Sequence, residues 1–204
     1  MRSDDVTRAV SLAIDTLSKA TTSDWTVPAG PLTWTCWETA EHMADDLFTY
    51  AAQLAPATPS TTTYVRFGWQ HRRPGGPGLT VFVDPEDGPE ALLTVLESCG
   101  AMLAAVLATA PPEKLSFHNY GASNASGFAA MGVVETLVHT NDIAAGLNVP
   151  WSPPAELCAA ALHRLFPWAP NDTAPWPTLL WATGRAELPG HELQTSWRWN
   201  GTPA

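Results

Sequence analysis

Apolar residues at helical spacing constrain the fold of this chain more than any other feature. The clearest stripe lies in the segment from about residue 33 or 35 to residue 54, and it consists of Ala40, Met43, Ala44, Leu47, Phe48, Ala51 and Leu54. Side chains three and four positions apart share one face of an α-helix, so the stripe predicts an amphipathic helix. The same periodicity predicts helices over residues 4–20, about 88–109 and about 126–147.

Four long helices predict an all-α fold, a four-helix bundle that occupies residues 1–150. The connection between the second and third helices is long. Its residues 61–69 and 79–83 are rich in β-branched and aromatic side chains, which favour extended chain. The segment Pro74–Gly78 between them predicts a turn. We therefore expect a strand-bearing crossover within the bundle.

The amino-acid composition of the chain changes after Pro150. The protein has ten tryptophans and nineteen prolines, and they become frequent in the C-terminal third. We predict a short helix over residues 154–166 and a strand over residues 194–199. Residues 151–204 are too few for a second full domain, so we expect a short mixed C-terminal extension that packs on the bundle.

Charge and cysteine content narrow the function classes. The formal net charge is -10 with only ten Lys and Arg, so the surface repels phosphate backbones and no nucleic-acid partner is expected. No apolar run reaches the roughly 18 residues of a membrane span, and Met1–Asp5 lacks a signal-peptide layout. We expect a cytoplasmic protein with no membrane partner. The three cysteines are far apart and form no CxxC pair, which indicates neither a disulfide framework nor a cysteine zinc site.

The fourth predicted helix contains the polar side chains that could bind a ligand. Residues 128–147 contain no Lys or Arg, and their only acidic residues and histidine are Glu135, His139 and Asp142. The spacing i, i+4, i+7 places these three side chains on one stripe. A carboxylate on a mostly apolar helix must be solvated, paired or bound to a cation. A metal ion would meet that need, and Glu135 and His139 can both reach it.

The second predicted helix supplies His42. This residue lies opposite the apolar stripe, with Glu38, Thr39, Asp45 and Asp46 as neighbours on its face. Facing polar stripes on two helices would bring together His42, Glu135 and His139. Three N/O ligands with one vacant position are typical of catalytic zinc, and nickel, iron and manganese accept the same ligands. The spacing by itself leaves two other interpretations open, an ordinary amphipathic helix and a solvated surface histidine.

Two segments resemble a known family. They run from Trp34 to Ala44 (W-T-C-W-E-T-A-E-H-M-A) and from Glu135 to Gly146 (E-T-L-V-H-T-N-D-I-A-A-G). Both resemble the DinB/YfiT-like superfamily, and more closely its mycothiol-dependent maleylpyruvate isomerase branch, over roughly residues 5–150. The resemblance implies a DinB-like bundle with His42, Glu135 and His139 as metal ligands. It implies that Asp142 orients a ligand or fixes the helix end without binding the metal.

The resemblance also implies a function. It indicates a metal-dependent S-transferase or isomerase, in which the metal activates mycothiol or a similar low-molecular-weight thiol for attack on an electrophilic small molecule. Two alternatives remain. One is a thiol-independent metalloenzyme on the same fold, such as a hydrolase or a biosynthetic tailoring enzyme. The other is a non-catalytic metal-binding stress protein. The sequence leaves a homodimer open.

A few further residues are candidates for the cleft. The segment Trp181–Arg185 resembles a W-x-G-R-like stretch near the end of relatives, with one extra residue. It suggests that Arg185 takes a catalytic role by binding a substrate carboxylate, while the alternative is a surface arginine at a helix end. His118 precedes a Gly/Asn loop and is a second candidate. Three aromatic residues either line a pocket or belong to the core, namely Tyr50, Tyr64 and Trp69.

Overall fold

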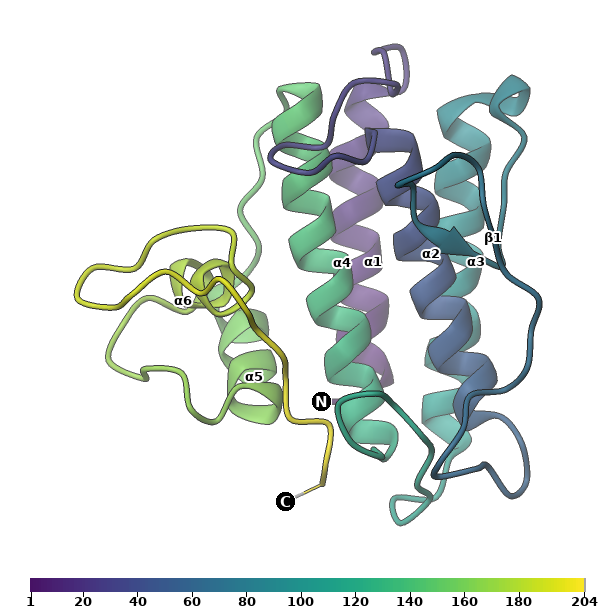
Figure 1. The fold of residues 1–204 in the computed structure, drawn as a ribbon, viewed down its shortest axis with the longest axis vertical. Helices are drawn as coiled ribbons and strands as arrows, with labels where there is room; N and C mark the ends of the chain where they lie inside the picture. The colour runs from purple at the N-terminus through teal and green to yellow at the C-terminus, as the bar shows by residue number, and fades with distance from the viewer. Residues whose placement is uncertain (204) are drawn as a thin grey trace.

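The computed structural model describes residues 1–203, and within them lie six α-helices and one two-stranded sheet (Figure 1). The four long helices are α1 (Ser3–Leu17), α2 (Cys36–Leu54), α3 (Gly88–Thr109) and α4 (Ala125–Leu147). The shorter elements are α5 (Ala155–Leu165), α6 (Pro175–Ala182), β1 (Gln70–His71), β2 (Gly78–Leu79) and two 3-10 turns at Ser18–Ala20 and Pro85–Asp87. The prediction of a mainly helical fold is confirmed.

The four long helices pack side by side. Helices α1 and α2 each contact both α3 and α4, so α1 and α2 occupy opposite corners of the bundle. Helix α5 packs on α4, and α6 packs on α5, which places the C-terminal residues beside α4 (Figure 1). Helix α4 is therefore the bundle helix on which the extension packs.

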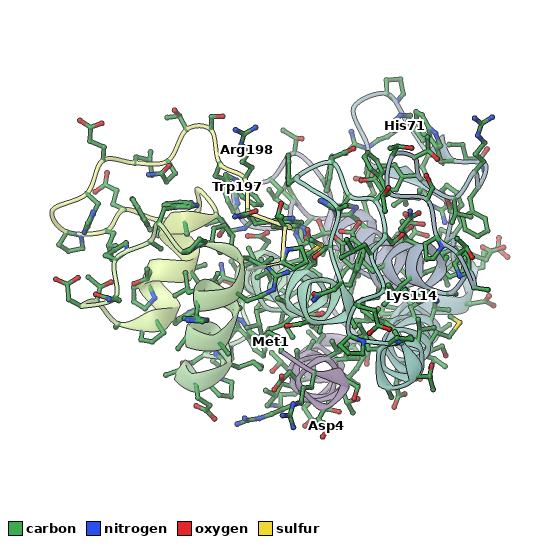
Figure 2. The ribbon with its side chains drawn as sticks, turned by 90° about the horizontal axis from the view of Figure 1, so that it is seen from below. Met1, Asp4, His71, Lys114, Trp197 and Arg198 are labelled. Carbon is green, nitrogen blue, oxygen red and sulfur yellow. The ribbon has the colours of Figure 1, made fainter. Side chains whose placement is uncertain are left out.

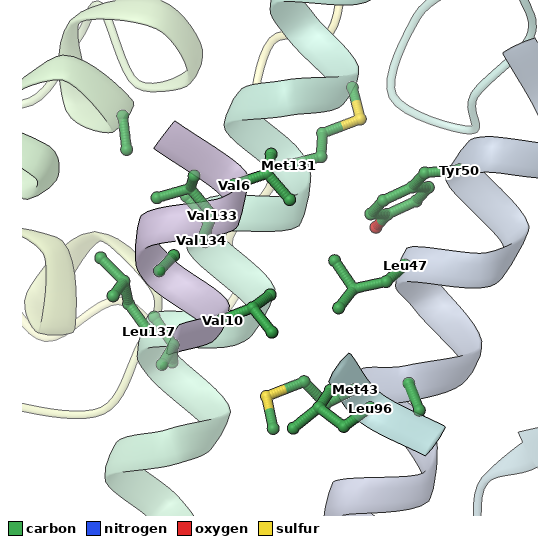
Figure 3. Packing of buried hydrophobic residues seen from close by; sticks show 14 of the residues in the cluster. Val6, Val10, Met43, Leu47, Tyr50, Leu96, Met131, Val133, Val134 and Leu137 are labelled. Atoms are coloured by element: carbon green, nitrogen blue, oxygen red, sulfur yellow. The ribbon is translucent and has the colours of Figure 1, made fainter. Parts of the chain in front are cut away.

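The core joins α2 to α4. Met43 and Leu47 of α2, Leu96 of α3, Val10 of α1 and Met131 of α4 belong to one hydrophobic cluster between the helices (Figure 3). All five side chains are buried. Burying one such side chain contributes roughly 1.5–3 kcal/mol to the stability of the fold. The cluster therefore holds α2 and α4 against each other. The polar faces of the two helices are held side by side as a result.

Local signals explain where these helices begin and end. Thr35 and Glu38 form a capping box at the start of α2, in which each side chain accepts a hydrogen bond from the other's backbone N–H, at 3.1 and 2.9 Å. The side chain of Asn124 accepts from the N–H of Gly127 and caps α4. Helix α4 ends at Asn148, which adopts the left-handed conformation at φ +56°.

The crossover holds less strand than its composition predicts. Residues 61–69 have no strand partner, and of residues 79–83 only Leu79 pairs. The sheet is a single antiparallel hairpin in which Gln70 pairs with Leu79 and His71 with Gly78. The β-branched and aromatic residues of the crossover favour extended chain, but a strand also needs a neighbouring strand as its hydrogen-bond partner.

The extension differs from its prediction in two ways. Helix α5 lies where a short helix was expected. Helix α6 was not predicted, because Pro175 and Pro177 in its first turn resemble a loop, although proline is tolerated at that position. The predicted strand at 194–199 is wrong: these residues form no strand, and their tryptophans pack on other aromatic rings.

One segment, Pro85–Thr109, is long and apolar enough to span a membrane by length and composition alone. Only 39% of its apolar window is buried. These are weak grounds for a membrane span, because the core helix of a bundle meets the same criterion. In this structure the helix within the segment, α3, packs against α1 and α2.

Candidate metal centre

His42, Glu135 and His139 meet between α2 and α4. One potential ligand atom from each residue lies within 4.8 Å of the other two, and the imidazole rings of His42 and His139 are 5.1 Å apart at their centroids. The side chains are between 7% and 22% exposed. Two imidazoles and one carboxylate form a group able to bind a metal ion, and their mutual spacing suits a single small cation.

The protonation states of two of the three residues favour metal binding. Burial, with the positive charge of His139, lowers the pKa of His42 to about 4, so this imidazole is neutral near pH 7. Burial alone would raise the pKa of Glu135, but the hydrogen bond from His139 and the charges of both histidines outweigh it and lower the pKa. A metal needs a neutral imidazole and an ionised carboxylate, which these two residues supply.

His139 lies between two carboxylates. Its Nε2 is 3.0 Å from Glu135 Oε2, and its Nδ1 is 3.2 Å from Asp142 Oδ2. Burial disfavours its charged form, but the hydrogen bonds with Asp142 and Glu135 outweigh burial and raise the pKa of His139. A carboxylate behind one ring nitrogen fixes the ring orientation and leaves the other nitrogen to face the ligand group.

Asp142 and Arg185 form an ion pair behind the histidine. Asp142 is fully buried, and it accepts hydrogen bonds from Nε and Nη2 of Arg185 at 3.0–3.2 Å. Nη1 of Arg185 donates to the carbonyl of Thr183 at 2.9 Å. Asp142 is thus placed to orient the ring of His139. Arg185 contacts Asp142 and the end of α6, and it does not line the cavity described next.

A cavity of about 860 Å³ opens beside the cluster. His42 and Glu135 lie in its wall, and so do the four residues that the sequence placed in a cleft or a core, namely Tyr50, Tyr64, Trp69 and His118. The volume suits a small-molecule ligand. Sequence reasoning missed Trp197 and Trp199, which belong to the extension and line the same cavity. In Figure 2, Trp197 and His71 lie on the side of the molecule opposite Asp4.

Asp46 is a second site residue that sequence reasoning missed. Its Oδ2 is 3.2 Å from Nε2 of His42, and it lines the cavity. Burial, with the negative charges of Glu135 and Asp45, raises the pKa of Asp46 well above its ordinary value. The signal was present, because Asp46 is four residues after His42 on the same polar face. The hydroxyl of Tyr50 also reaches this cluster, 3.5 Å from Glu135 Oε1.

No cysteine reaches the centre. The Cys36 thiol points at the backbone carbonyls of Pro28 and Ile143, both at 3.8 Å, and burial raises its pKa to about 11. Cys99 and Cys158 are also buried thiols, with pKa values raised by burial. Any sulfur at the centre would have to come from a ligand. No protein-family model, curated protein or solved structure matches this chain, so its function is inferred from the residues that meet here.

Proposed function

We propose that this chain is a metal-dependent enzyme that joins a low-molecular-weight thiol to an electrophilic small molecule, as a transferase or an isomerase. The observation that carries the proposal is the convergence of His42, Glu135 and His139, of which His42 and Glu135 lie in the wall of a cavity large enough for small-molecule substrates. Zinc fits this ligand set best, and nickel, iron or manganese fit it less selectively. When bound, the ion would act as a Lewis acid that lowers the pKa of a thiol.

The thiol part of the proposal rests on the resemblance to the mycothiol-dependent maleylpyruvate isomerase branch of the DinB/YfiT-like superfamily. Three observations are compatible with it. The protein supplies three N/O ligands, no cysteine of the chain reaches them, and the cavity beside them has room for a thiol together with a second substrate. A thiol sulfur is a ligand that zinc accepts readily.

The residues around the cluster suit the proton and bond changes of such a reaction. The thiol S–H bond breaks, and Asp46 Oδ2 takes the proton, because Asp46 lines the cavity and lies 3.2 Å from Nε2 of His42. The sulfur bonds to an electrophilic carbon of an unsaturated carbonyl compound, and the displaced electron pair moves to the carbonyl oxygen. A transferase returns the proton to carbon and keeps the C–S bond. An isomerase breaks that bond after rotation and releases the thiol.

The extension has two roles in this proposal. Arg185 fixes Asp142, which in turn orients His139. Trp197 and Trp199 close part of the cavity and reduce the access of water to the reacting groups. The bundle would then supply the ligands, and the extension would supply orientation and enclosure.

The test uses the full chain loaded with cobalt in place of zinc. Thiols are added one at a time, beginning with mycothiol, glutathione and cysteine, and the absorption spectrum is followed for a sulfur-to-metal band. Turnover is then measured with a panel of unsaturated carbonyl compounds. We expect one thiol to produce the band and to support turnover, and both effects to disappear in His42→Ala. The matched control is His163→Ala on α5, which removes an exposed histidine away from the cavity.

Three outcomes would contradict the thiol proposal. If no thiol alters the cobalt spectrum, the thiol does not bind at this centre. Turnover that proceeds without a thiol would indicate a hydrolase or a tailoring enzyme. Metal binding without turnover of any compound would indicate a non-catalytic metal-binding protein.

A further inference from the structure

His118 is a buried histidine that the metal cluster does not use. It lies in the loop between α3 and α4, is 7% exposed and lines the cavity. Its Nδ1 accepts a hydrogen bond from the backbone N–H of Tyr120 at 3.1 Å. A nitrogen that accepts a hydrogen bond carries no proton, so the neutral ring carries its proton on Nε2. Among residues 1–203, no protein group accepts a hydrogen bond from Nε2.

Aromatic rings hold this imidazole in place. The ring of Trp199 lies 5.4 Å from it at a tilt of 36°, and the rings of Tyr120, Tyr50 and Tyr64 surround it at 5.5–6.4 Å. Burial lowers the pKa of His118 to about 4, which agrees with the neutral form that the hydrogen bond at Nδ1 requires. The ring therefore offers one fixed donor, Nε2–H, from the wall of the cavity.

Arg66 adds a charge to the same cavity. It is exposed, it lines the cavity, and it is the one arginine or lysine that does so. Arg72, Arg73 and Arg185 each bind a carboxylate, whereas Arg66 makes no ion pair with any residue in the described part of the chain. A chain with ten basic and twenty acidic residues thus leaves one guanidinium free at its candidate site.

We propose that His118 Nε2–H binds an acceptor oxygen of the substrate, a carbonyl or carboxylate oxygen, and that Arg66 selects an anion. The substrate class is then a small carboxylate with a flat apolar body, which the aromatic walls accommodate. A ligand that only donates hydrogen bonds, or that carries a positive charge, would leave both groups without a partner. This inference rests on the proposed function only in naming that ligand as the electrophile, where the same N–H would face the oxygen that gains charge.

The experiment measures binding, so that it does not depend on turnover. The probes are benzoate, benzamide and benzamidine, which share a flat ring and differ in charge and in acceptor oxygens. Each is titrated into the full chain with and without zinc, while the imidazole N–H signals are followed by NMR. We expect the proton of His118 to reside on Nε2 and its signal to shift with benzoate. We expect benzamide to bind more weakly than benzoate. Benzamidine can pair with Asp46 or Glu135 when zinc is absent, so we expect it to leave the His118 signal unshifted.

Variants separate the two contacts. In His118→Phe, which keeps a flat ring for the surrounding aromatics, benzoate affinity should fall about tenfold through loss of one hydrogen bond to a charged group. Arg66→Gln lies on the surface and should weaken benzoate several-fold while leaving benzamide unchanged. The matched control is Arg8→Gln, an exposed arginine on α1 that is paired with Glu156.

Several results would overturn the inference. They are a proton on Nδ1 of His118, an equal shift of the His118 signal by benzoate and by benzamidine, or unchanged benzoate binding in both His118→Phe and Arg66→Gln. The two proposals fail separately. If the wild-type chain binds benzoate but takes up no zinc, the proposed function fails and this inference stands. Zinc binding without benzoate binding would do the reverse.

Discussion

Carboxylates with little solvent exposure meet different partners on the two sides of α2, the side that faces the crossover and the side that faces the cavity and α4. On the crossover side, Glu38 pairs with Arg73 and Glu41 with Arg72, at 2.6–2.8 Å. Asp45 accepts two backbone N–H bonds at 2.7 Å. Every acid on this side therefore has its partner within the chain, as a buried charge requires.

Asp45 also lines the cavity, but the crossover backbone bonds it; the other acids of the cavity are Asp46 of α2 and Glu135 of α4. Their close polar neighbours are His42, His139 and the hydroxyl of Tyr50, and neither forms an ion pair with an arginine or lysine in residues 1–203. Carboxylates with little solvent exposure are thus structural where the crossover supplies arginines. They become part of a candidate metal centre where the chain supplies histidines instead.

The largest expected effect is on the crossover side. Arg72→Ala leaves the fully buried Glu41 without its cation, and we expect the free energy of unfolding to fall by about 3 kcal/mol, the low end for a broken buried pair because Arg72 is 30% exposed. Urea denaturation measures it. The control is Arg8→Ala, which breaks an exposed pair with Glu156 and should leave the free energy of unfolding nearly unchanged. Equal losses in the two variants would show that the crossover pairs are not structural.

The next effect is on metal affinity. Asp142→Asn keeps the size of the side chain but removes the charge that orients His139, and we expect zinc affinity to fall about tenfold to hundredfold. Competition with a chelating dye measures it. Arg72→Ala, which perturbs only the crossover side, should leave zinc affinity unchanged where it remains folded. If it lowers affinity as much as Asp142→Asn does, the two sides are not independent.

The smallest effect is a dependence on pH. The pKa of His139 is raised in the metal-free chain, so a proton competes with the metal below that pKa. We expect zinc affinity to fall about tenfold for each pH unit below it, and to fall more steeply only near the pKa of His42, about 4. Chelator competition at several pH values follows this slope. A flat profile between neutral pH and mildly acidic pH would contradict the assignment of His139.

The helices of the bundle were predictable because their periodicity is local. The apolar stripe of α2 and the uncharged run of α4 each lie within about 20 residues, so the sequence alone locates them. The approach of His42 to Glu135 and His139 was predicted from facing polar stripes and from family resemblance. The structure brings these three side chains together.

Contacts between distant segments were not predictable. Nothing local indicates that Arg72 and Arg73 reach α2, or that Arg185 reaches Asp142 across 43 residues of sequence. Trp197 and Trp199 were assigned to a strand, because aromatic residues favour strands and packed aromatic clusters alike. The same ambiguity hid their place in the cavity wall, which only the tertiary structure reveals.

The central claim is that His42, Glu135 and His139 bind one divalent ion. Elemental analysis of protein purified without an affinity tag tests it most directly, with the His139→Ala variant and the His163→Ala control prepared in the same way. We expect about one divalent ion, zinc above all, per chain in the wild type and the control, and almost none in His139→Ala. Unchanged metal content in His139→Ala, or no metal in a wild-type protein that also fails to take up zinc, would contradict it.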